Sequence, residues 1–517
     1  MQKQDKTRNY LNTFVKTSIF VFFSIVLSKV FTYGYKIVIA RNFGAGVYGN
    51  FSLAIIITGF FIAFASLGFS DGLVRYISYY LGKNDSARIK YFLSVTTRLM
   101  LCSGIVGGLL LFFLAEVIAV GIFRNAELAV FLRIFSFIVP LSLLGSIGIA
   151  FLRSYERAKT ASFLVGIFHN GIRLVIIAGL MAIGLGMLST PYSYVLSYVF
   201  AIAAILYFAK SQLISVVRVR VSIGSSEKSK LLRELFSYSW PLVLVGLLLS
   251  MFYWIDSLVL GYFTNAEIVG FYSAATTLAG LFVMAPDLFS QLFLPVISKE
   301  LSRNNKTVIR TLTKQITKWI YMINIPVLGV IFFFPGAILN LFFGPEFMVA
   351  QAALRILVLG GMFSGFINIF TNLLSAKKET KLILYNFAAF SAVNLALSVL
   401  LIKYGMVGVA IGTAVSWIGF YLTLFLQIKK KCGFYPVKRN ILRVTGVAIV
   451  PIVLLYVMAI SFGQSRSGMI ISAAVFGVLY GSLLIATKSL DERDWAVVRD
   501  IKTKVMRSIA PAVRLVE

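Results

Sequence analysis

Long apolar segments alternate with short polar loops along the whole chain. Each apolar segment is about 20 residues long, the length that an α-helix needs to cross a hydrocarbon layer of about 30 Å. The pattern therefore predicts an all-α polytopic membrane protein with about 14 transmembrane helices. The expected helices are 17–40, 47–68, 92–114, 129–152, 161–185, 191–213, 238–262, 268–297, 319–342, 347–375, 380–402, 405–428, 443–462 and 468–487.

Positive charge concentrates in every second loop between these segments. Short loops rich in Lys and Arg mark the cytoplasmic side of a membrane, so we expect a multi-pass protein of the cell (plasma or inner) membrane with both termini in the cytoplasm. The net charge of +30 would also suit a partner of nucleic acid. The cations are spread over many loops that face one leaflet, which favours membrane lipids and not nucleic acid as their surroundings.

The chain divides into two lobes at a basic segment. We expect an N-terminal six-helix lobe in 1–213, a cytoplasmic linker in 214–237 and a C-terminal six-helix lobe in 238–428. An additional helix pair lies within 429–487, and an amphipathic cytoplasmic tail occupies 488–517.

The first hairpins of the two lobes align with one another. A displacement of 221 residues places 31–54 over 252–275, with Ala45 identical to Ala266 and Gly49 identical to Gly270. Because each lobe has an even number of helices, both lobes have the same topology, as in a parallel repeat. Repeats of this kind are typical of transporters whose halves rock around a central site.

Two cytoplasmic segments have apolar residues spaced three and four apart, which places them on one helical face. We expect interfacial helices at 71–91 and in the tail. The apolar positions of the tail are Trp495, Val498, Ile501, Val505 and Ile509.

Three segments carry recognisable motifs: IVIARNFGAGVYG at 37–49, YSWP at 238–241 and GMVGVAIGT at 405–413. In these segments the chain resembles the polysaccharide flippases (Wzx-type) of the multidrug/oligosaccharidyl-lipid/polysaccharide exporter superfamily. The resemblance implies a flippase for a lipid-linked oligosaccharide, usually on a polyprenyl diphosphate carrier. The flippase would move this oligosaccharide from the cytoplasmic to the outer leaflet for the assembly of surface polysaccharide or glycan. A glycan polymerase or ligase of the same pathway is a candidate partner.

Cations inside the predicted helices are candidate substrate-binding residues, because an intramembrane charge is costly unless it serves a site. Lys29 and Lys36 lie two helical turns apart on one face, and Arg173 lies near the middle of its helix. A diphosphate headgroup needs such cations at this depth. His169, the sole histidine, shares the face of Arg173. The remaining members of the predicted set are Arg98 and Arg133.

Other interpretations of these residues stay open. Long cationic side chains near helix ends can extend to the membrane interface instead, and this suits Arg98 and Arg133 better than Lys29 and Arg173. His169 is equally well explained as a hydrogen-bonded packing residue.

The second lobe holds acids, and the resemblance implies an ion-coupling site there. In related flippases an acid, an Asn and a hydroxyl help to hold sodium, and the matching positions are Asp256, Asn394 and Thr413. Ser398 stands where a second acid is expected, so Na⁺, H⁺ and the membrane potential all remain candidates for coupling. We add Asp287 to this set, although it could instead satisfy the backbone that Pro286 frees.

Two other functional classes are weighed against a flippase. A cation-coupled multidrug exporter of the same fold is the alternative, although its substrates are often cationic and suit the cationic first lobe less well. An enzyme is not expected, because the outer loops are too short for a catalytic domain. One His and two Cys residues provide no metal centre, and no resident cofactor is expected.

Overall fold

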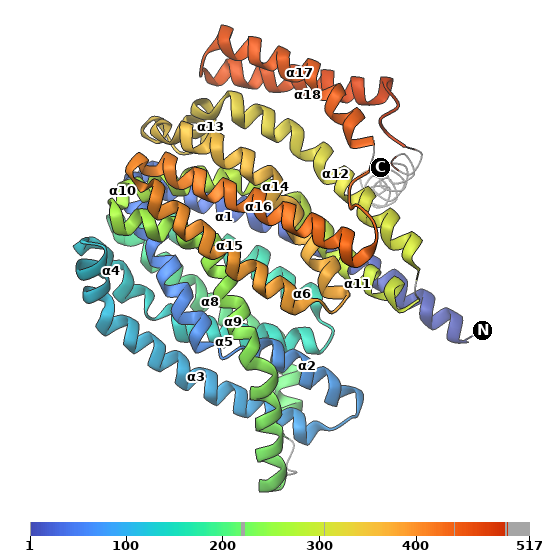
Figure 1. Ribbon diagram of the computed structural model, residues 1–517. Coiled ribbons are helices and arrows are strands. Elements are labelled where there is room, and N and C mark those ends of the chain that lie inside the picture. Colours follow the sequence, from blue (N-terminus) through green and yellow to red (C-terminus); the bar gives the residue numbers. More distant parts are fainter. Residues whose placement is uncertain (1, 219–222, 304, 439, 492–493, 495–517) are drawn as a thin grey trace, which may run out of the picture.

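The computed structural model describes residues 2–218, 223–303, 305–438, 440–491 and 494, with side chains described from Phe23 onward except at a few positions within α11. The described residues form helices and no strands (Figure 1). The N-terminal lobe contains α1 Gln2–Ala65, α2 Phe69–Gly82, α3 Ser86–Glu116, α4 Ala126–Phe135, α5 Ile138–Ser154, α6 Ala158–Ser162, α7 His169–Ala182 and α8 Ser189–Val217. Short π-helical or 3₁₀ segments lie at Val117–Ile122, Phe163–Phe168 and Gly186–Leu188.

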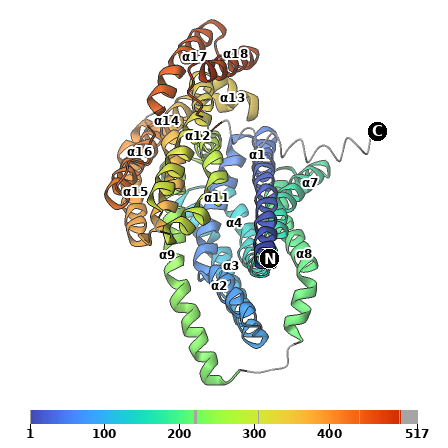
Figure 2. The same ribbon diagram turned by 90° about the vertical axis from the view of Figure 1, so that its right-hand side faces the viewer.

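The C-terminal lobe is followed by two further helices. It contains α9 Ser225–Phe263, α10 Ala266–Ala279, α11 Leu281–Ser302, α12 Lys306–Phe333, α13 Pro335–Phe342, α14 Gln351–Ala376, α15 Thr380–Leu401 and α16 Gly405–Cys432, with 3₁₀ turns at Pro345–Ala350 and Ile402–Tyr404. The last pair, α17 Asn440–Phe462 and α18 Arg466–Ala486, packs on α12 at the edge of this lobe (Figure 2).

Twelve stretches of the described residues are long and apolar enough to cross a membrane. Two of them, Phe23–Ala65 and Thr380–Cys432, are 43 and 53 residues long. A helix of 43 residues would extend about 65 Å, roughly twice the hydrocarbon thickness. Each stretch is broken near its middle by a glycine at positive φ, Gly44 or Gly405. This agrees with two crossings in each stretch, and the expected count of about 14 stays a prediction.

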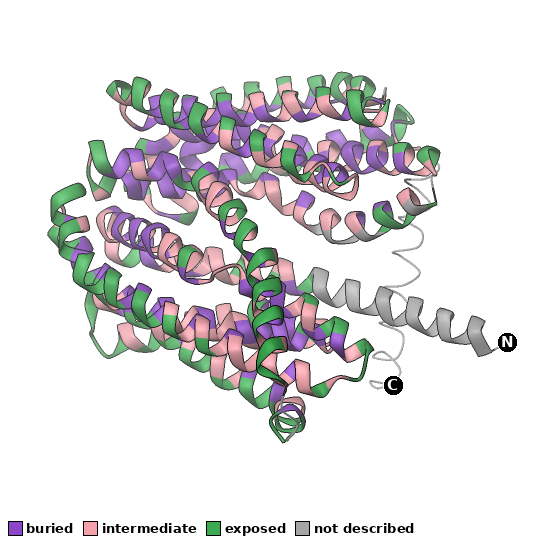
Figure 3. Ribbon diagram, turned by 60° about the horizontal axis from the view of Figure 1, so that its bottom comes forward, coloured by how far each residue is buried: buried purple, intermediate pink, exposed green. Residues whose placement is uncertain are grey.

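Exposed residues lie along the outward faces of the helices (Figure 3), and many of them are large and apolar, as expected for contact with lipid. Phe113 of α3 is 73% exposed, and Leu442 of α17 is 76% exposed. Exposed apolar side chains spread over the outer faces of most helices would be unfavourable in water, and lipid suits them better.

The two lobes meet at the aligned hairpins. A Cβ added at Gly49 would lie 1.7 Å from the carbonyl oxygen of Ala266, and a Cβ at Gly270 would lie 1.9 Å from that of Ala45. Gly49 and Gly270 are counterparts in the two hairpins, and so are their partners Ala266 and Ala45. The same contact is therefore made twice, once from each hairpin. This reciprocity agrees with the expected repeat, and it brings α1 against α10.

Three expected elements differ from the structure. The segment 71–91 is not one interfacial helix: α2 ends at Gly82, Asp85 caps α3, and the apolar face with Leu73 and Ile77 packs on α3 and α5. The protein itself therefore covers the face that was expected to enter the headgroup layer.

The expected linker 214–237 is largely helical. Helix α8 extends to Val217, and α9 begins at Ser225 because Leu231 and Leu235 provide a buried stripe.

The helix break expected at Pro286 lies at Gly280 instead, between α10 and α11. The amphipathic positions of the tail lie outside the described residues.

Candidate functional site

Arg173 of α7 is buried in the N-terminal lobe at 5% exposure. Its guanidinium lies 3.8 Å from the ring centroid of Tyr194. It contacts His169 Nε2 at 3.0 Å and donates from Nε to Ser197 Oγ at 3.3 Å. Among the described residues no carboxylate forms an ion pair with it. A buried cation therefore rests on an aromatic face and neutral acceptors.

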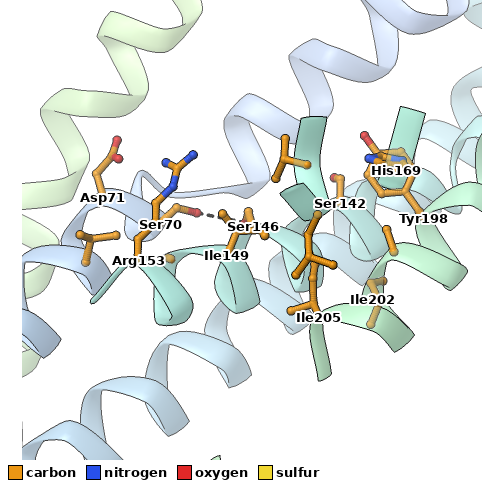
Figure 4. A pocket seen from close by; sticks show the side chains of 16 residues that line it. Ser70, Asp71, Ser142, Ser146, Ile149, Arg153, His169, Tyr198, Ile202 and Ile205 are labelled. Atoms are coloured by element: carbon orange, nitrogen blue, oxygen red, sulfur yellow. Dashed lines mark hydrogen bonds between the residues drawn. The ribbon is translucent and has the colours of Figure 1, made fainter. Parts of the chain in front are cut away.

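A pocket of about 310 Å³ with a mixed polar and apolar lining begins beside this cluster (Figure 4). His169 and Tyr198 lie at one end, and Asp71 and Arg153 lie at the other (Figure 4). Serine hydroxyls line the space between them, from Ser70, Ser142 and Ser146. The sequence did not identify these serines, because only the packing of α2 on α5 brings them together.

Two further cations of the predicted set extend from α1 across the lobe interface. Lys36 donates from Nζ to Thr277 Oγ1 of α10 at 3.0 Å. Lys29 Nζ lies 3.7 Å from Asp287 Oδ2 of α11, and both side chains are about one-third exposed. Asn368 donates to the other oxygen of Asp287 at 2.9 Å. The two lysines therefore face the same partner lobe, as their spacing along the helix predicts.

The C-terminal lobe holds a buried acid with hydroxyl partners. Asp256 Oδ2 accepts from Tyr272 at 2.8 Å and from Thr413 at 3.3 Å. Thr413 Oγ1 lies 3.4 Å from Asn394 Oδ1, to which Ser398 donates at 3.1 Å. The three matched positions of the predicted ion-coupling set thus lie together, while Tyr272 was missed because a Tyr on the next helix gave no distinct signal.

The donor set fits a hard cation, which prefers oxygen ligands. Carboxylate, amide and hydroxyl oxygens face one another here, and the amide nitrogen of Asn394 is buried without a hydrogen-bond partner. In the described part of the chain no group of three His, Cys, Asp or Glu residues could hold a metal ion. Asp287, the fourth member of the predicted set, lies instead at the lobe interface with Lys29.

The other two predicted substrate residues lie apart from these clusters. Arg133 is exposed and forms an ion pair of 2.6 Å with Glu116. Arg98 is exposed on α3. Neither approaches Arg173, Lys29 or Lys36 through any interaction of the described residues.

A charged cluster that the sequence did not reveal joins α12 to the segment after α18. Lys318 is fully buried and lies 2.7 Å from Asp494 and 3.1 Å from Asp491. Lys438 also pairs with Asp491. Burial disfavours the charged form of Asp491, but hydrogen bonds from Lys438 and Lys318 outweigh it and hold its pKa below the ordinary value. The cluster fastens the last helix pair to the lobe.

Known proteins share both the sequence pattern and the fold. An uncharacterized membrane protein of Methanocaldococcus jannaschii is 26% identical over 384 residues, covering 71% of this chain and 74% of that protein. A Shigella flexneri protein named as an O-antigen transporter is 24% identical over 413 residues, covering 77% and 93%. Lipid II flippase MurJ of Bacillus subtilis is 26% identical over 279 residues, covering 48% and 51%.

Solved structures support the same fold at low sequence identity. A lipid II flippase MurJ in an inward closed conformation has a TM-score of 0.71 at 17% identity, covering 92% of this chain and 99% of that one. An inward-facing multidrug resistance MATE transporter of the MOP superfamily has a TM-score of 0.66 at 16% identity, covering 80% and 98%.

Family patterns cover most of the same region. The pattern of the MatE family matches residues 241–402. That of the polysaccharide biosynthesis protein family matches residues 14–299, more than half of the chain. The chain therefore belongs to the polysaccharide biosynthesis protein family, and it is a membrane transporter and not an enzyme.

Proposed function

We propose that this protein is a flippase for a lipid-linked oligosaccharide on a polyprenyl diphosphate-type carrier. The headgroup enters between the lobes from the cytoplasmic leaflet while the polyprenyl chain stays in lipid. Rocking of the lobes then exposes the headgroup to the outer leaflet. The names of the O-antigen transporter and of MurJ support this class of substrate.

One observation carries the proposal: the membrane-embedded cations Lys36 and Arg173 have only neutral partners among the described residues. A buried cation is costly unless an opposite charge compensates it. An anionic headgroup would supply that charge at each transport cycle. A site for cationic drugs would have the opposite requirement.

Lys29 differs from these two because Asp287 already accompanies it. A phosphate that enters between the lobes would compete with this carboxylate for the ammonium group. Since the pair is part-exposed and not in close contact, its separation would cost little. In this scheme Asp287 holds Lys29 in place until substrate arrives.

The Asp256 cluster would provide coupling, with Na⁺ or H⁺ as the ion. Asp256, Asn394 and Thr413 would hold the ion, and Ser398 and Tyr272 would complete the oxygen set. An inside-negative potential would add to the driving force, at about 2.3 kcal/mol per charge and 100 mV.

The test is lipid extraction from cells depleted of this protein, followed by mass spectrometry of carrier-linked glycans. We expect a complete oligosaccharide to accumulate on its carrier, and wild-type protein to relieve the block. Lys36→Gln and Arg173→Gln should fail to relieve it, while the matched control Arg133→Gln should succeed. Normal glycan levels after depletion, with no second flippase in the cell, would contradict the proposal.

The MatE pattern at 241–402 favours a second candidate, a cation-coupled multidrug exporter. In that case depletion would raise drug sensitivity and leave carrier-linked glycans unchanged. A glycan polymerase or ligase that uses the exported glycan is the proposed partner of the flippase.

Accessibility labelling of each terminus would test the proposal that both termini lie in the cytoplasm.

A further inference from the structure

A groove of about 1390 Å³ lies between α2 and the first turns of α9. These two helices contact one another and lie side by side in Figure 1. It is separate from the pocket beside Arg173. Its lining combines cationic side chains with tyrosines, and it contains Arg75, Lys230 and Arg233 but a single acid, Glu234.

The cations of the groove outnumber its acids among the described residues. In the described ranges Arg75, Lys230 and Arg233 form no ion pair, whereas nearby Arg88 pairs with both Asp85 and Glu227. Three positive charges thus face one negative charge in the groove. The lining is therefore complementary to an anion.

The groove is held in shape by contacts between its walls. The Arg75 guanidinium lies 4.3 Å from the ring centroid of Tyr238, and Tyr76 donates to the carbonyl oxygen of Glu234 at 3.2 Å. At its edge α2 and α9 approach so closely that a Cβ at Gly68 would lie 2.2 Å from the Ser239 carbonyl oxygen. The cations are therefore presented on a preformed surface.

The position of the groove along α9 indicates where its occupant resides. Phe236 and Trp240 on the same helix are 37% and 55% exposed, and the apolar stretch of α9 begins there. Exposed aromatic residues at the start of an apolar span mark the headgroup level of a bilayer. An occupant at this level has acyl chains that can lie along α9.

We propose that this groove is a binding site for the headgroup of an anionic phospholipid. Arg75 and Arg233 offer paired donors to phosphate oxygens, and Lys230 adds a point charge. The hydroxyl group of Tyr79 can bond a glycerol headgroup, since Tyr76 already donates to Glu234. Because α2 and α9 belong to different lobes, the lipid contacts both halves of the transporter. This site goes beyond the proposed flippase function and holds for any transported substrate.

The test uses the full-length protein in nanodiscs of phosphatidylcholine and phosphatidylglycerol, with retained lipids counted by native mass spectrometry. We expect wild-type protein to retain phosphatidylglycerol, and the double variant Arg75→Gln/Arg233→Gln to bind it about tenfold more weakly. The matched control Lys306→Gln/Arg310→Gln removes two exposed cations of the same sign elsewhere and should retain the lipid. Equal melting temperatures of the two variants would show that both are folded.

Three outcomes would overturn the proposal. Equal loss in both double variants would show diffuse attraction to the surface and no site. Full competition by glycerol phosphate at the same concentration would show a site for soluble phosphate. Absence of any preference over phosphatidylcholine in the wild-type protein would show that the groove takes no anionic lipid.

Discussion

Two buried cations in this protein have opposite surroundings. Lys318 of α12 is fully buried with two carboxylates, Asp491 and Asp494, within 3.1 Å. Arg173 of α7 is nearly as buried, but its partners are an aromatic ring, a histidine and a serine. The first cation is compensated by the protein and fixes the last helix pair. The second has no carboxylate partner among the described residues, and in the proposed function the substrate would supply the negative charge.

The largest expected effect on stability is at Lys318. Lys318→Met leaves Asp494 buried without its cation, and breaking a buried pair costs about 3 kcal/mol or more. We expect a marked fall in melting temperature in detergent, measured against exposed Lys306→Met as control. A fall equal to that of the control would show that the cluster does not stabilise the fold.

Arg173→Met should lower transport strongly and stability only a little. Because no ion pair of the described residues is broken, the melting temperature should change less than in Lys318→Met. Flipping of lipid-linked oligosaccharide in proteoliposomes should fall at least about tenfold, which corresponds to 1.4 kcal/mol. Arg173→Lys should restore part of the rate, since the charge returns without its paired donors. Full transport by Arg173→Met would contradict the proposed role of Arg173 in binding the substrate.

Asp256→Asn tests whether ion coupling in the C-terminal lobe is separate from headgroup binding in the N-terminal lobe. The amide keeps the shape and an acceptor for Tyr272 and Thr413 but cannot carry a charge. We expect binding of the headgroup to survive, whereas dependence of flipping on a Na⁺ or pH gradient should disappear. Flipping that responds to neither gradient in the wild-type protein would eliminate ion coupling at this site.

The pair between Lys29 and Asp287 should show a smaller effect. Asp287→Asn removes the internal competitor for Lys29, so headgroup affinity should rise about two- to fivefold, as expected for a part-exposed pair. Isothermal titration or native mass spectrometry would measure it. Weaker binding would instead place Asp287 among the residues that hold the substrate.

The smallest expected effect is the pH dependence of the Lys318 cluster. The pKa of Asp491 is lower in the folded protein than its ordinary value of 3.8. Its contribution is therefore fully present above that value and is lost as the pH falls through the lower folded pKa. Melting curves of wild-type and Asp491→Asn protein should converge in acid, and a constant difference at all pH values would contradict this.

The sequence was sufficient for features that repeat or follow helical periodicity. The spacing of Lys29 and Lys36 placed them on one face, and the Gly49 and Gly270 contacts agree with the parallel repeat that the aligned hairpins predict. The grouping of Asp256, Asn394 and Thr413 followed from resemblance to known flippases and not from the pattern itself.

Contacts between distant helices could not be read in this way. The pairing of Lys29 with Asp287 joins residues 258 positions apart, and the Lys318 cluster depends on how the segment after α18 returns to α12. The start of α9 was missed because its charged residues concealed the buried stripe of Leu231 and Leu235. In each case tertiary packing, which local propensity does not encode, decides the outcome.

The most direct test of the central claim is binding of a polyprenyl diphosphate compared with the uncharged polyprenol of equal length. Native mass spectrometry of the purified protein would measure both ligands. Wild-type protein should prefer the diphosphate, Arg173→Gln should lose most of that preference, and Arg133→Gln should keep it. Equal affinity of the wild-type protein for the two ligands would contradict an anionic headgroup site in the N-terminal lobe.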